Sequence, residues 1–364
     1  MGWVEKEEKS PACGYGLLGL CCSACLFGPC RISPFEKDSE KGICGDVPDL
    51  MVAKNLLRVV TGEALEGLRC LKEATESLAS HNLSKASKRR ISEEKQKSII
   101  EKYGLPSHIT GKALSRHLSK EVERLLSPSS QGQHTFLKNI FPKKVFPSLN
   151  QYPFPPRSLM DFLLDSMKIG LAKSSDVGEI LWQSLQISII TIICEELRDD
   201  VYDLIDGEGL SRRDAKVLDA IKSLSSDLSP VMLLLEDERI PSKEWVYQMA
   251  QELEKLSKNK VLTLSLRGIG SLLEIGRRLS EKWVLPIGGM RIVVLISSPS
   301  ATWTLGALAL GFTVISTPSL PIHGSERVEK FFSEDLKKRF GNIYFPTWRE
   351  DLLNAVLEFL RWKD

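Results

Sequence analysis

Four of the chain's eight cysteines lie within ten positions, in the segment CCSACLFGPC at residues 21–30. Three of them and a later cysteine form a set of four with separations of 3, 5 and 14 residues: Cys22, Cys25, Cys30 and Cys44. Residues 1–46 are rich in Cys, Gly and Pro and carry too few apolar residues to build a core of their own. We therefore predict that this segment folds around a prosthetic group.

The compartment decides how such a cluster is interpreted. The N-terminal sequence MGWVEKEEKSPACG is charged and lacks the apolar stretch of a signal peptide. The longest apolar run, LQISIITIIC at residues 185–194, is too short to span a bilayer. We expect a cytoplasmic protein without membrane insertion, in which thiols stay reduced and favour metal binding or redox chemistry over disulfides.

Three kinds of site fit the cysteine spacing. Thiolates close together in a glycine-rich loop can enclose a [4Fe-4S] cluster, with Gly28 and Gly45 giving clearance and Pro29 fixing a turn. Structural zinc is the main rival, but zinc sites usually pair two short knuckles and only one CxxC occurs here. Disulfides or free thiols remain the third possibility.

Cys13 and Cys21 lie eight positions apart and are left over from the set of four. Two thiolates cannot complete a four-cysteine cluster within one chain. A two-fold symmetric homodimer could complete it, because an isologous interface brings the same pair from each subunit to the axis. The alternative is a pair of buried thiols, which the spacing does not exclude.

The charge is balanced, with a net charge of +2, but it is unevenly distributed. Residues 85–144 contain 14 Lys and Arg against 5 Asp and Glu. Lys and Glu alternate there at helical spacings in SEEKQKSIIEKYG, and no nucleic-acid-binding motif accompanies them. We interpret the stretch as solvated helix faces and predict no nucleic-acid partner.

The pattern predicts an α/β multidomain protein with three parts. An iron-sulfur module at residues 1–46 precedes a helical domain at residues 47–226, with helices expected after Pro48 and around 92–102, 112–126, 157–172, 176–196 and 211–224. Residues 227–364 should form one doubly wound parallel-sheet (Rossmann-like) domain, because five apolar runs alternate with helical stretches. The runs begin at residues 231, 261, 291, 312 and 342. Gly268 and Gly270 form GxG, but Leu273 replaces the third glycine of a dinucleotide fingerprint, so a structural turn is favoured.

The segments CGYGLLGLCCSACLFGPCRIS and GICGDVPDLMVAKNLLRVV closely resemble the N-terminal region of nickel-containing carbon monoxide dehydrogenases. The resemblance implies that Cys13 and Cys21 build a cluster bridging two subunits of a homodimer. It also implies a [4Fe-4S] relay cubane in each subunit, held by Cys22, Cys25, Cys30 and Cys44. RSLMDFLLDSMKIG and the C-terminal SSPSATWTLGALALGFTVISTPSLPIHGSERVEKFF look like later segments of the same family, and a middle α/β domain is expected to be missing.

Departures from the family pattern bear on the expected activity. The family holds its catalytic nickel-iron-sulfur cluster with further cysteines and a histidine, whereas only Cys70 and Cys194 follow Cys44 here. The helix after NLLR lacks histidine before His81, and SSPSATWTLGALALG lacks the family's lysine. Cys70 and Cys194 are expected to be core residues, and His81, His108, His117, His134 and His323 are assigned no role.

These departures favour an electron-transfer protein that keeps the relay and bridging clusters and binds no nickel. Its redox partner would be a ferredoxin or a larger oxidoreductase. Two alternatives remain open. One is a carbon monoxide dehydrogenase or related oxidoreductase with a degenerate or relocated site; the other is an assembly or regulatory partner of a full-length relative.

Overall fold

The structure is a computed structural model that describes the helical core, the N-terminal loops and the strands of one sheet. The described residues are 13–35, 41–83, 93–109, 111–127, 159–171, 176–206, 231–236, 262–267, 292–296, 300–316, 320–335 and 343–344, with residues 251, 255, 272, 273 and 275.

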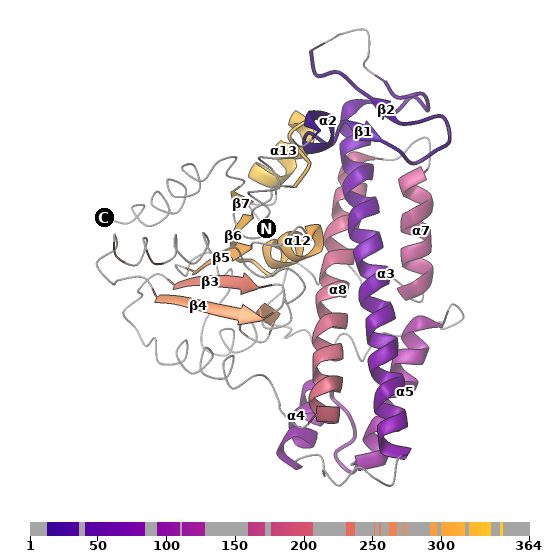
Figure 1. The fold of residues 1–364 in the computed structure, drawn as a ribbon, viewed down its shortest axis with the longest axis vertical. Coiled ribbons are helices and arrows are strands. Elements are labelled where there is room, and N and C mark those ends of the chain that lie inside the picture. Colours follow the sequence, from indigo (N-terminus) through magenta and orange to yellow (C-terminus); the bar gives the residue numbers. More distant parts are fainter. Residues whose placement is uncertain are drawn as a thin grey trace.

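Two long helices form the spine of the molecule. Helix α3 spans Pro48–Leu83, and helix α8 spans Val177–Asp206. Pro48 begins α3 with its fixed φ, and Asp49 places a negative charge near the positive end of the helix dipole. The two helices lie side by side along the long axis of the molecule (Figure 1). Burial of their facing apolar side chains makes one hydrophobic core.

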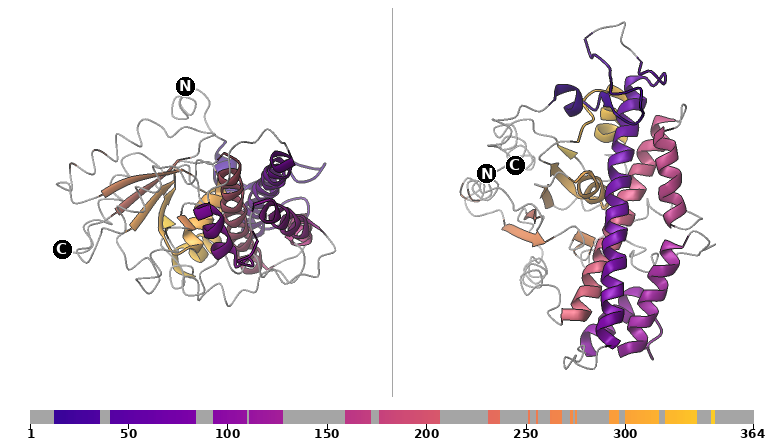
Figure 2. Two further views of the ribbon diagram at one scale, coloured as in Figure 1. Left: turned by 90° about the horizontal axis from the view of Figure 1, so that it is seen from below. Right: turned by 45° about the vertical axis from the view of Figure 1, so that its right-hand side comes forward.

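Helices α5 (Gly111–Leu126) and α7 (Leu159–Leu171) pack on α3, on the side of the spine away from the sheet, as both views of Figure 2 show. Helix α4 (Glu93–Tyr103) contacts α8 at the lower end of the spine (Figure 1). In α5 the buried apolar residues recur at helical spacing: Leu114, Leu118, Val122 and Leu125. These helices confirm the predicted elements at 92–102, 112–126 and 157–172 to within two residues at each end.

A five-stranded parallel sheet lies on the other side of α8. Its strands are β3 (Val231–Glu236), β4 (Leu262–Arg267), β5 (Ile292–Ile296), β6 (Thr313–Ser316) and β7 (Ile343–Tyr344). The spatial order is β4-β3-β5-β6-β7, and every neighbouring pair is parallel. The five strands expected from apolar runs are confirmed. The doubly wound cover of helices stays a prediction, because most of the connecting segments lie outside the described residues.

Helix α12 (Ala301–Ala309) joins the sheet to the spine. In the chain it lies between β5 and β6. All nine of its residues are buried, and it packs against α8 (Figure 1). Gly306 allows the close approach, since a Cβ there would lie 2.2 Å from Cδ1 of Ile192. The sheet is thereby fixed to the helical core.

The N-terminal cysteine segments lie at one end of the spine. They contain α2 (Gly14–Leu17), β1 (Cys21–Cys22) and β2 (Cys30–Arg31), next to α13 (Glu326–Lys330) and the π-helical turn η4 (Phe331–Asp335). Leu20 and Ile32 are buried in the same hydrophobic cluster as α3. This module therefore takes part of its apolar packing from the spine.

Helix α8 differs from its prediction. It continues ten residues beyond the expected end at 196, because Leu197, Val201 and Leu204 extend its buried face. The apolar run 185–194 is thus part of a segment, Val177–Tyr202, that is long and apolar enough to cross a membrane by length and composition. However, 72% of its most apolar window is buried in the protein, which indicates a core helix. The helix expected at 211–224 and the boundary at 226 lie outside the described residues.

Candidate metal centre

Strands β1 and β2 bring the first cysteines together. They pair antiparallel, with Cys22 opposite Cys30 and Cys21 opposite Arg31. The connection between them carries Cys25 and turns tightly at Gly28, whose N–H donates to the Cys25 carbonyl at 3.1 Å. A Cβ at Gly28 would lie 3.0 Å from the Cys22 carbonyl oxygen and 3.3 Å from the Cys30 nitrogen, so only glycine fits without a backbone shift.

The segment that carries Cys44 folds against the same hairpin. The N–H of Ile43 donates to Sγ of Cys30 at 3.5 Å. The loop is closed on itself, because the N–H of Gly42 donates to the Asp46 carbonyl at 2.8 Å and Gly45 adopts a φ of 88°. Segments bearing all four predicted cubane ligands therefore meet at one end of the molecule, where Cys25 and Cys44 are exposed and Cys22 and Cys30 are half-buried.

Helix α3 fixes these loops through polar side chains on its first turns. Lys54 Nζ and Asp46 form a buried ion pair, with distances of 2.7 and 2.9 Å to the two carboxylate oxygens. The next residue, Asn55, donates from Nδ2 to the carbonyls of Gly19 and Cys21, at 2.9 Å each. Arg58 Nη1 donates to Sγ of Cys22 at 3.4 Å and to Oδ1 of Asn55 at 2.6 Å.

Cys13 and Cys21 flank the turn that Asn55 holds. Cys13 is exposed at the N-cap of α2, and Cys21 is half-buried in β1. Hydrogen bonds from the backbone N–H groups of Gly16 and Tyr15 lower the pKa of the Cys13 thiol below its usual range. Backbone donors thus favour the thiolate form, which is the form that binds iron.

A loop of the C-terminal part closes over this turn. Gly324 N–H donates to the Leu18 carbonyl at 2.8 Å, and Ser325 Oγ donates to Oδ1 of Asp49 at 2.6 Å. A Cβ at Gly324 would lie 2.4 Å from the Leu18 oxygen. The glycine is required by this close approach, which ties residues 320–325 to the module.

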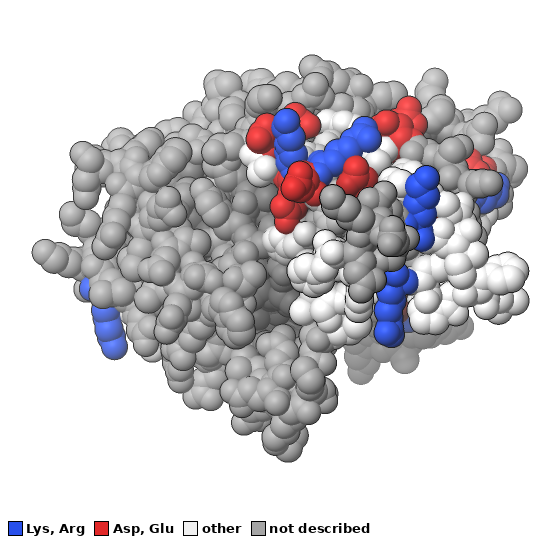
Figure 3. All heavy atoms as spheres, turned by 90° about the horizontal axis from the view of Figure 1, so that it is seen from above, with Lys and Arg blue, Asp and Glu red and all other residues white. Residues whose placement is uncertain are grey.

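The surface of this end is mixed in charge. Figure 3 views it directly and shows acidic and basic side chains interleaved beside an uncharged area. Exposed apolar side chains of the module include Leu26, Phe27, Phe35 and Ile43. Arg31 also lies over the ring of Tyr15, 5.8 Å from its centroid.

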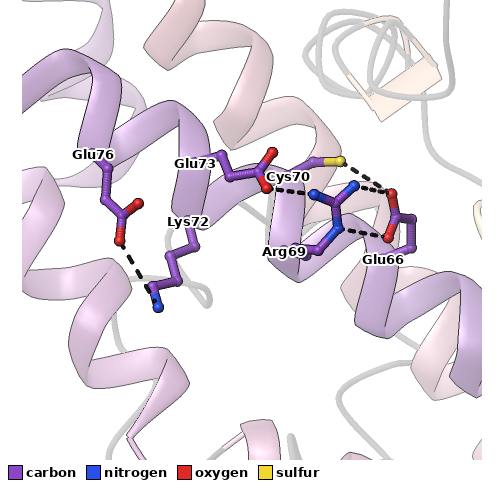
Figure 4. Close-up of polar contacts among 6 residues, drawn as sticks. All are labelled: Glu66, Arg69, Cys70, Lys72, Glu73 and Glu76. Carbon is purple, nitrogen blue, oxygen red and sulfur yellow. Dashed lines mark hydrogen bonds and ion pairs between the residues drawn. The ribbon is translucent and has the colours of Figure 1, made fainter.

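The two later cysteines both lie on helices but differ in burial. The expected core position is confirmed for Cys194 and is wrong for Cys70, which is half-buried at the surface of α3. Cys70 of α3 donates to Oε1 of Glu66 at 3.7 Å, beside the exposed ion pairs of Arg69 with Glu66 and Glu73 and of Lys72 with Glu76 (Figure 4). Burial, followed by the negative charge of Glu66, raises the pKa of Cys70. Cys194 is a core residue of α8, and its burial raises the pKa of the thiol to about 12.

The fit of the four cysteines to an iron-sulfur cluster depends on their ligand atoms, on the N–H groups near the sulfurs and on the space around them. Among the described residues, no three His, Cys, Asp or Glu side chains are grouped to hold a single metal ion. A cubane distributes its thiolates over four irons and so spreads its ligands more widely than one ion does. The donor set of four thiols, the N–H donors to two of the sulfurs and the glycine clearance at Gly28 fit such a cluster.

The sequence assigned no role to any histidine, and the structure describes the side chains of His108, His117 and His323. His108 is exposed in the loop after α4. His323 lies in the loop that closes over the module, with Nδ1 2.7 Å from Oε1 of Glu329. His117 lies on α5, far along the spine from the module. His134 is outside the described residues, as is the side chain of His81.

The residues that the cysteine pattern did not predict are those of α3. Asn55 and Arg58 are three positions apart and so share one helix face, which is the available sequence signal. Their targets lie 34 to 36 positions away, so the signal does not say what the face contacts.

Comparison with known proteins identifies the family. The family model described as "Prismane/CO dehydrogenase family" matches residues 20–212, which is more than half of the chain. The chain belongs to the prismane/CO dehydrogenase family. The match begins at the cysteine hairpin and runs through α8, so it includes the spine and most of the cysteine-bearing segments described above.

Several members of this family are similar over parts of the chain. Carbon monoxide dehydrogenase 1 from Methanosarcina acetivorans is 39% identical over 104 residues, which are 28% of this chain and 17% of that protein. Carbon monoxide dehydrogenase 1 from Methanosarcina mazei is 50% identical over 62 residues, which are 17% of this chain and 10% of that protein. These matches span less than a fifth of the length of either relative.

Solved structures of the family share the fold at low identity. Carbon monoxide dehydrogenase IV from Carboxydothermus hydrogenoformans superposes with a TM-score of 0.74 at 14% identity, covering 99% of this chain and 95% of that one. A nickel-free carbon monoxide dehydrogenase from Thermococcus sp. AM4, produced without the CooC maturase, gives 0.77 at 13%, covering 99% and 94%. At these identities the likeness concerns the fold.

Proposed function

We propose that the chain is an iron-sulfur electron-transfer protein of the prismane/CO dehydrogenase family. A [4Fe-4S] cubane is held by Cys22, Cys25, Cys30 and Cys44. Cys13 and Cys21 hold a further cluster shared with the same pair of a second copy. The observation that carries the proposal is the meeting of the β1–β2 hairpin with the loop of Cys44, where N–H groups donate to cysteine sulfurs.

When bound, the cubane supplies a site that gains and loses one electron. The chain's own residues then have distinct tasks. The Lys54–Asp46 ion pair anchors the loop of Cys44 to α3, and Gly28 lets the hairpin backbone approach the cluster. The N–H groups of Ile43 and Arg58 stabilise negative charge on the sulfurs of Cys30 and Cys22.

The proposal includes no nickel site and no catalytic cluster in this chain. It is supported by the cysteine inventory, since only Cys70 and Cys194 follow Cys44. Cys194 is buried in the core with a raised pKa, which disfavours the thiolate that a metal needs. Cys70 is half-buried on α3 beside ion-paired side chains.

The homodimer is part of the same proposal. Support comes from the exposed Cys13 thiol and from the apolar side chains of Leu26, Phe27 and Phe35 near the same end. Leu26 is 103% exposed and Phe35 is 92% exposed, so these side chains are available for burial by a partner surface. The redox partner is a ferredoxin or a larger oxidoreductase, and the compartment is the cytoplasm.

Anaerobic purification followed by iron, sulfide, nickel and mass analysis tests the proposal. We expect a dimer with iron and sulfide in equal amounts and without stoichiometric nickel. The double variant C13A/C21A should lose the shared cluster and the dimer while retaining the cubane, whereas C70A should keep both. Nickel at one atom per chain, or sustained viologen-linked oxidation of carbon monoxide, would replace this proposal with an enzyme.

A second function is favoured by the exposed position of Cys13 on a chain with few later ligands. In it the chain pairs with a full-length relative through the shared cluster and modulates that relative. Co-purification from the native cell discriminates the two functions. Recovery of the homodimer alone supports the relay, and recovery of a mixed dimer supports the assembly role.

A further inference from the structure

Arg58, a side chain of α3, donates a hydrogen bond to a cysteine sulfur. Its Nη1 lies 3.4 Å from Sγ of Cys22, in a part-buried setting. The contact joins positions separated by 36 residues, so it depends on the tertiary fold. The guanidinium group of arginine is a cation with several N–H donors in one plane.

Asn55 fixes the orientation of that guanidinium. Nη1 of Arg58 carries two hydrogens, and it donates both to Sγ of Cys22 and to Oδ1 of Asn55 at 2.6 Å. Because the two acceptors are held by different elements, rotation of the planar group would break at least one bond. Asn55 itself is held, since its amide donates to the carbonyls of Gly19 and Cys21.

We propose that Arg58 is the positioning residue that raises the reduction potential of the cluster bound by Cys22, with Asn55 orienting it. This inference rests on the proposed function, because it requires a cluster at Cys22. Reduction adds one electron to the cluster and increases the negative charge on its sulfurs. A fixed cation that also donates an N–H to Sγ stabilises the reduced form more than the oxidised form.

The same contacts connect the two cysteine sets. Asn55 donates to the backbone of Cys21, which belongs to the pair for the shared cluster, and through Arg58 it reaches Cys22. The adjacent cysteines thus belong to different proposed clusters but share one pair of side chains. Arg58 and Asn55 therefore contact both Cys22, a proposed ligand of the cubane, and the backbone of Cys21, a proposed ligand of the shared cluster.

The test is an anaerobic redox titration of the intact protein, with dithionite as reductant and mediators, followed by the spectrum of the reduced cluster. The variants are R58Q, which removes the charge and keeps a donor, R58K, which keeps the charge, and N55A. The matched control is R31Q, which removes an exposed charge adjacent to Cys30 that contacts the ring of Tyr15. Iron and sulfide are measured for each variant.

In R58Q we expect the equilibrium constant for reduction to fall about tenfold, which corresponds to about 59 mV for one electron. N55A should shift in the same direction, R58K should shift less than R58Q, and R31Q should stay near wild type. An R58Q midpoint equal to that of wild type at equal iron content overturns this inference alone. Equal shifts in R58Q and R31Q also overturn it, because they would reflect net charge. A wild-type protein without iron overturns the proposed function as well, and iron analysis reports that outcome before any titration.

Discussion

Glu63, on α3, accepts the backbone N–H of Thr302 at 2.7 Å, although 239 positions separate the two residues. The same carboxylate accepts the N–H of Ala301 and the hydroxyl of Ser300, both at 3.1 Å. The two N–H groups belong to the first turn of α12, where no carbonyl within the helix can accept them, and Ser300 is the N-cap of that helix. A side chain of the spine therefore caps the helix that joins the sheet to the core.

Replacing this carboxylate should weaken the attachment of the sheet. In E63Q one oxygen becomes an amide donor that faces backbone N–H groups, and the favourable charge at the helix N-terminus is lost. We expect the free energy of unfolding to fall by about 1–2 kcal/mol, measured by urea denaturation. The control is E76Q on the exposed part of α3, where the ion pair with Lys72 is 3.8 Å long and a change below about 0.5 kcal/mol is expected. Equal losses in both variants would contradict the capping role.

The ion pair of Lys54 and Asp46 is buried, with side-chain exposures of 1% and 5%. In K54M the Asp46 carboxylate would stay buried without its cation, and we expect a loss of about 3–5 kcal/mol in unfolding free energy. The double variant K54M/D46N removes both charges and should recover part of that loss. A double variant as unstable as K54M would show that the lysine acts through packing alone, and thermal and urea denaturation decide between these outcomes.

The buried thiol of Cys194 should make the free energy of unfolding depend on pH in the alkaline range. Its pKa in the folded chain is raised to about 12, so the unfolded chain releases this proton at lower pH than the folded chain does. The contribution to stability is complete below the ordinary thiol pKa, and it falls as pH rises from about 9 towards 12, by up to about 1.4 kcal/mol per pH unit.

Urea denaturation of wild type and C194A between pH 8 and about 11 measures this slope. C194A should be less stable near pH 8, because a small cavity replaces the sulfur, and its stability should fall less steeply with pH. Parallel curves for the two proteins would show that Cys194 does not titrate in this way. C70A is the comparison for a thiol that is half-buried instead of fully buried, and its curve should differ less from that of wild type than the curve of C194A does.

Because α12 packs closely on α8, we expect substitution of Gly306 to destabilise the protein. In G306A the new methyl group would lie 2.2 Å from Cδ1 and 2.9 Å from Cγ1 of Ile192, so the Ile192 side chain or one of the two helices must shift. We expect a loss of about 1–3 kcal/mol in unfolding free energy. The double variant G306A/I192V removes Cδ1 and should recover at least half of the loss, which double-mutant analysis of denaturation curves would detect. A stable G306A protein would contradict the close packing.

The apolar runs of the sequence located all five strands, because buried parallel strands need continuous aliphatic residues. The predicted end of α8 was wrong by ten residues, since Leu197 within the charged stretch EELRDD and Val201 and Leu204 beyond it continue the buried face of the helix. The cysteine spacing predicted which segments meet at β1 and β2. The contacts of Glu63, Asn55 and Arg58 could not be predicted, because each depends on packing between segments far apart in the chain.

The central claim is that four cysteines near the N-terminus hold a redox-active cluster. The most direct measurement is iron and acid-labile sulfide in anaerobically purified C25A, compared with wild type and with C70A as the control. The account predicts that C25A loses the iron of the cubane and its reducible spectrum, whereas C70A retains both. Iron and spectrum unchanged in C25A, or lost equally in C70A, would contradict it.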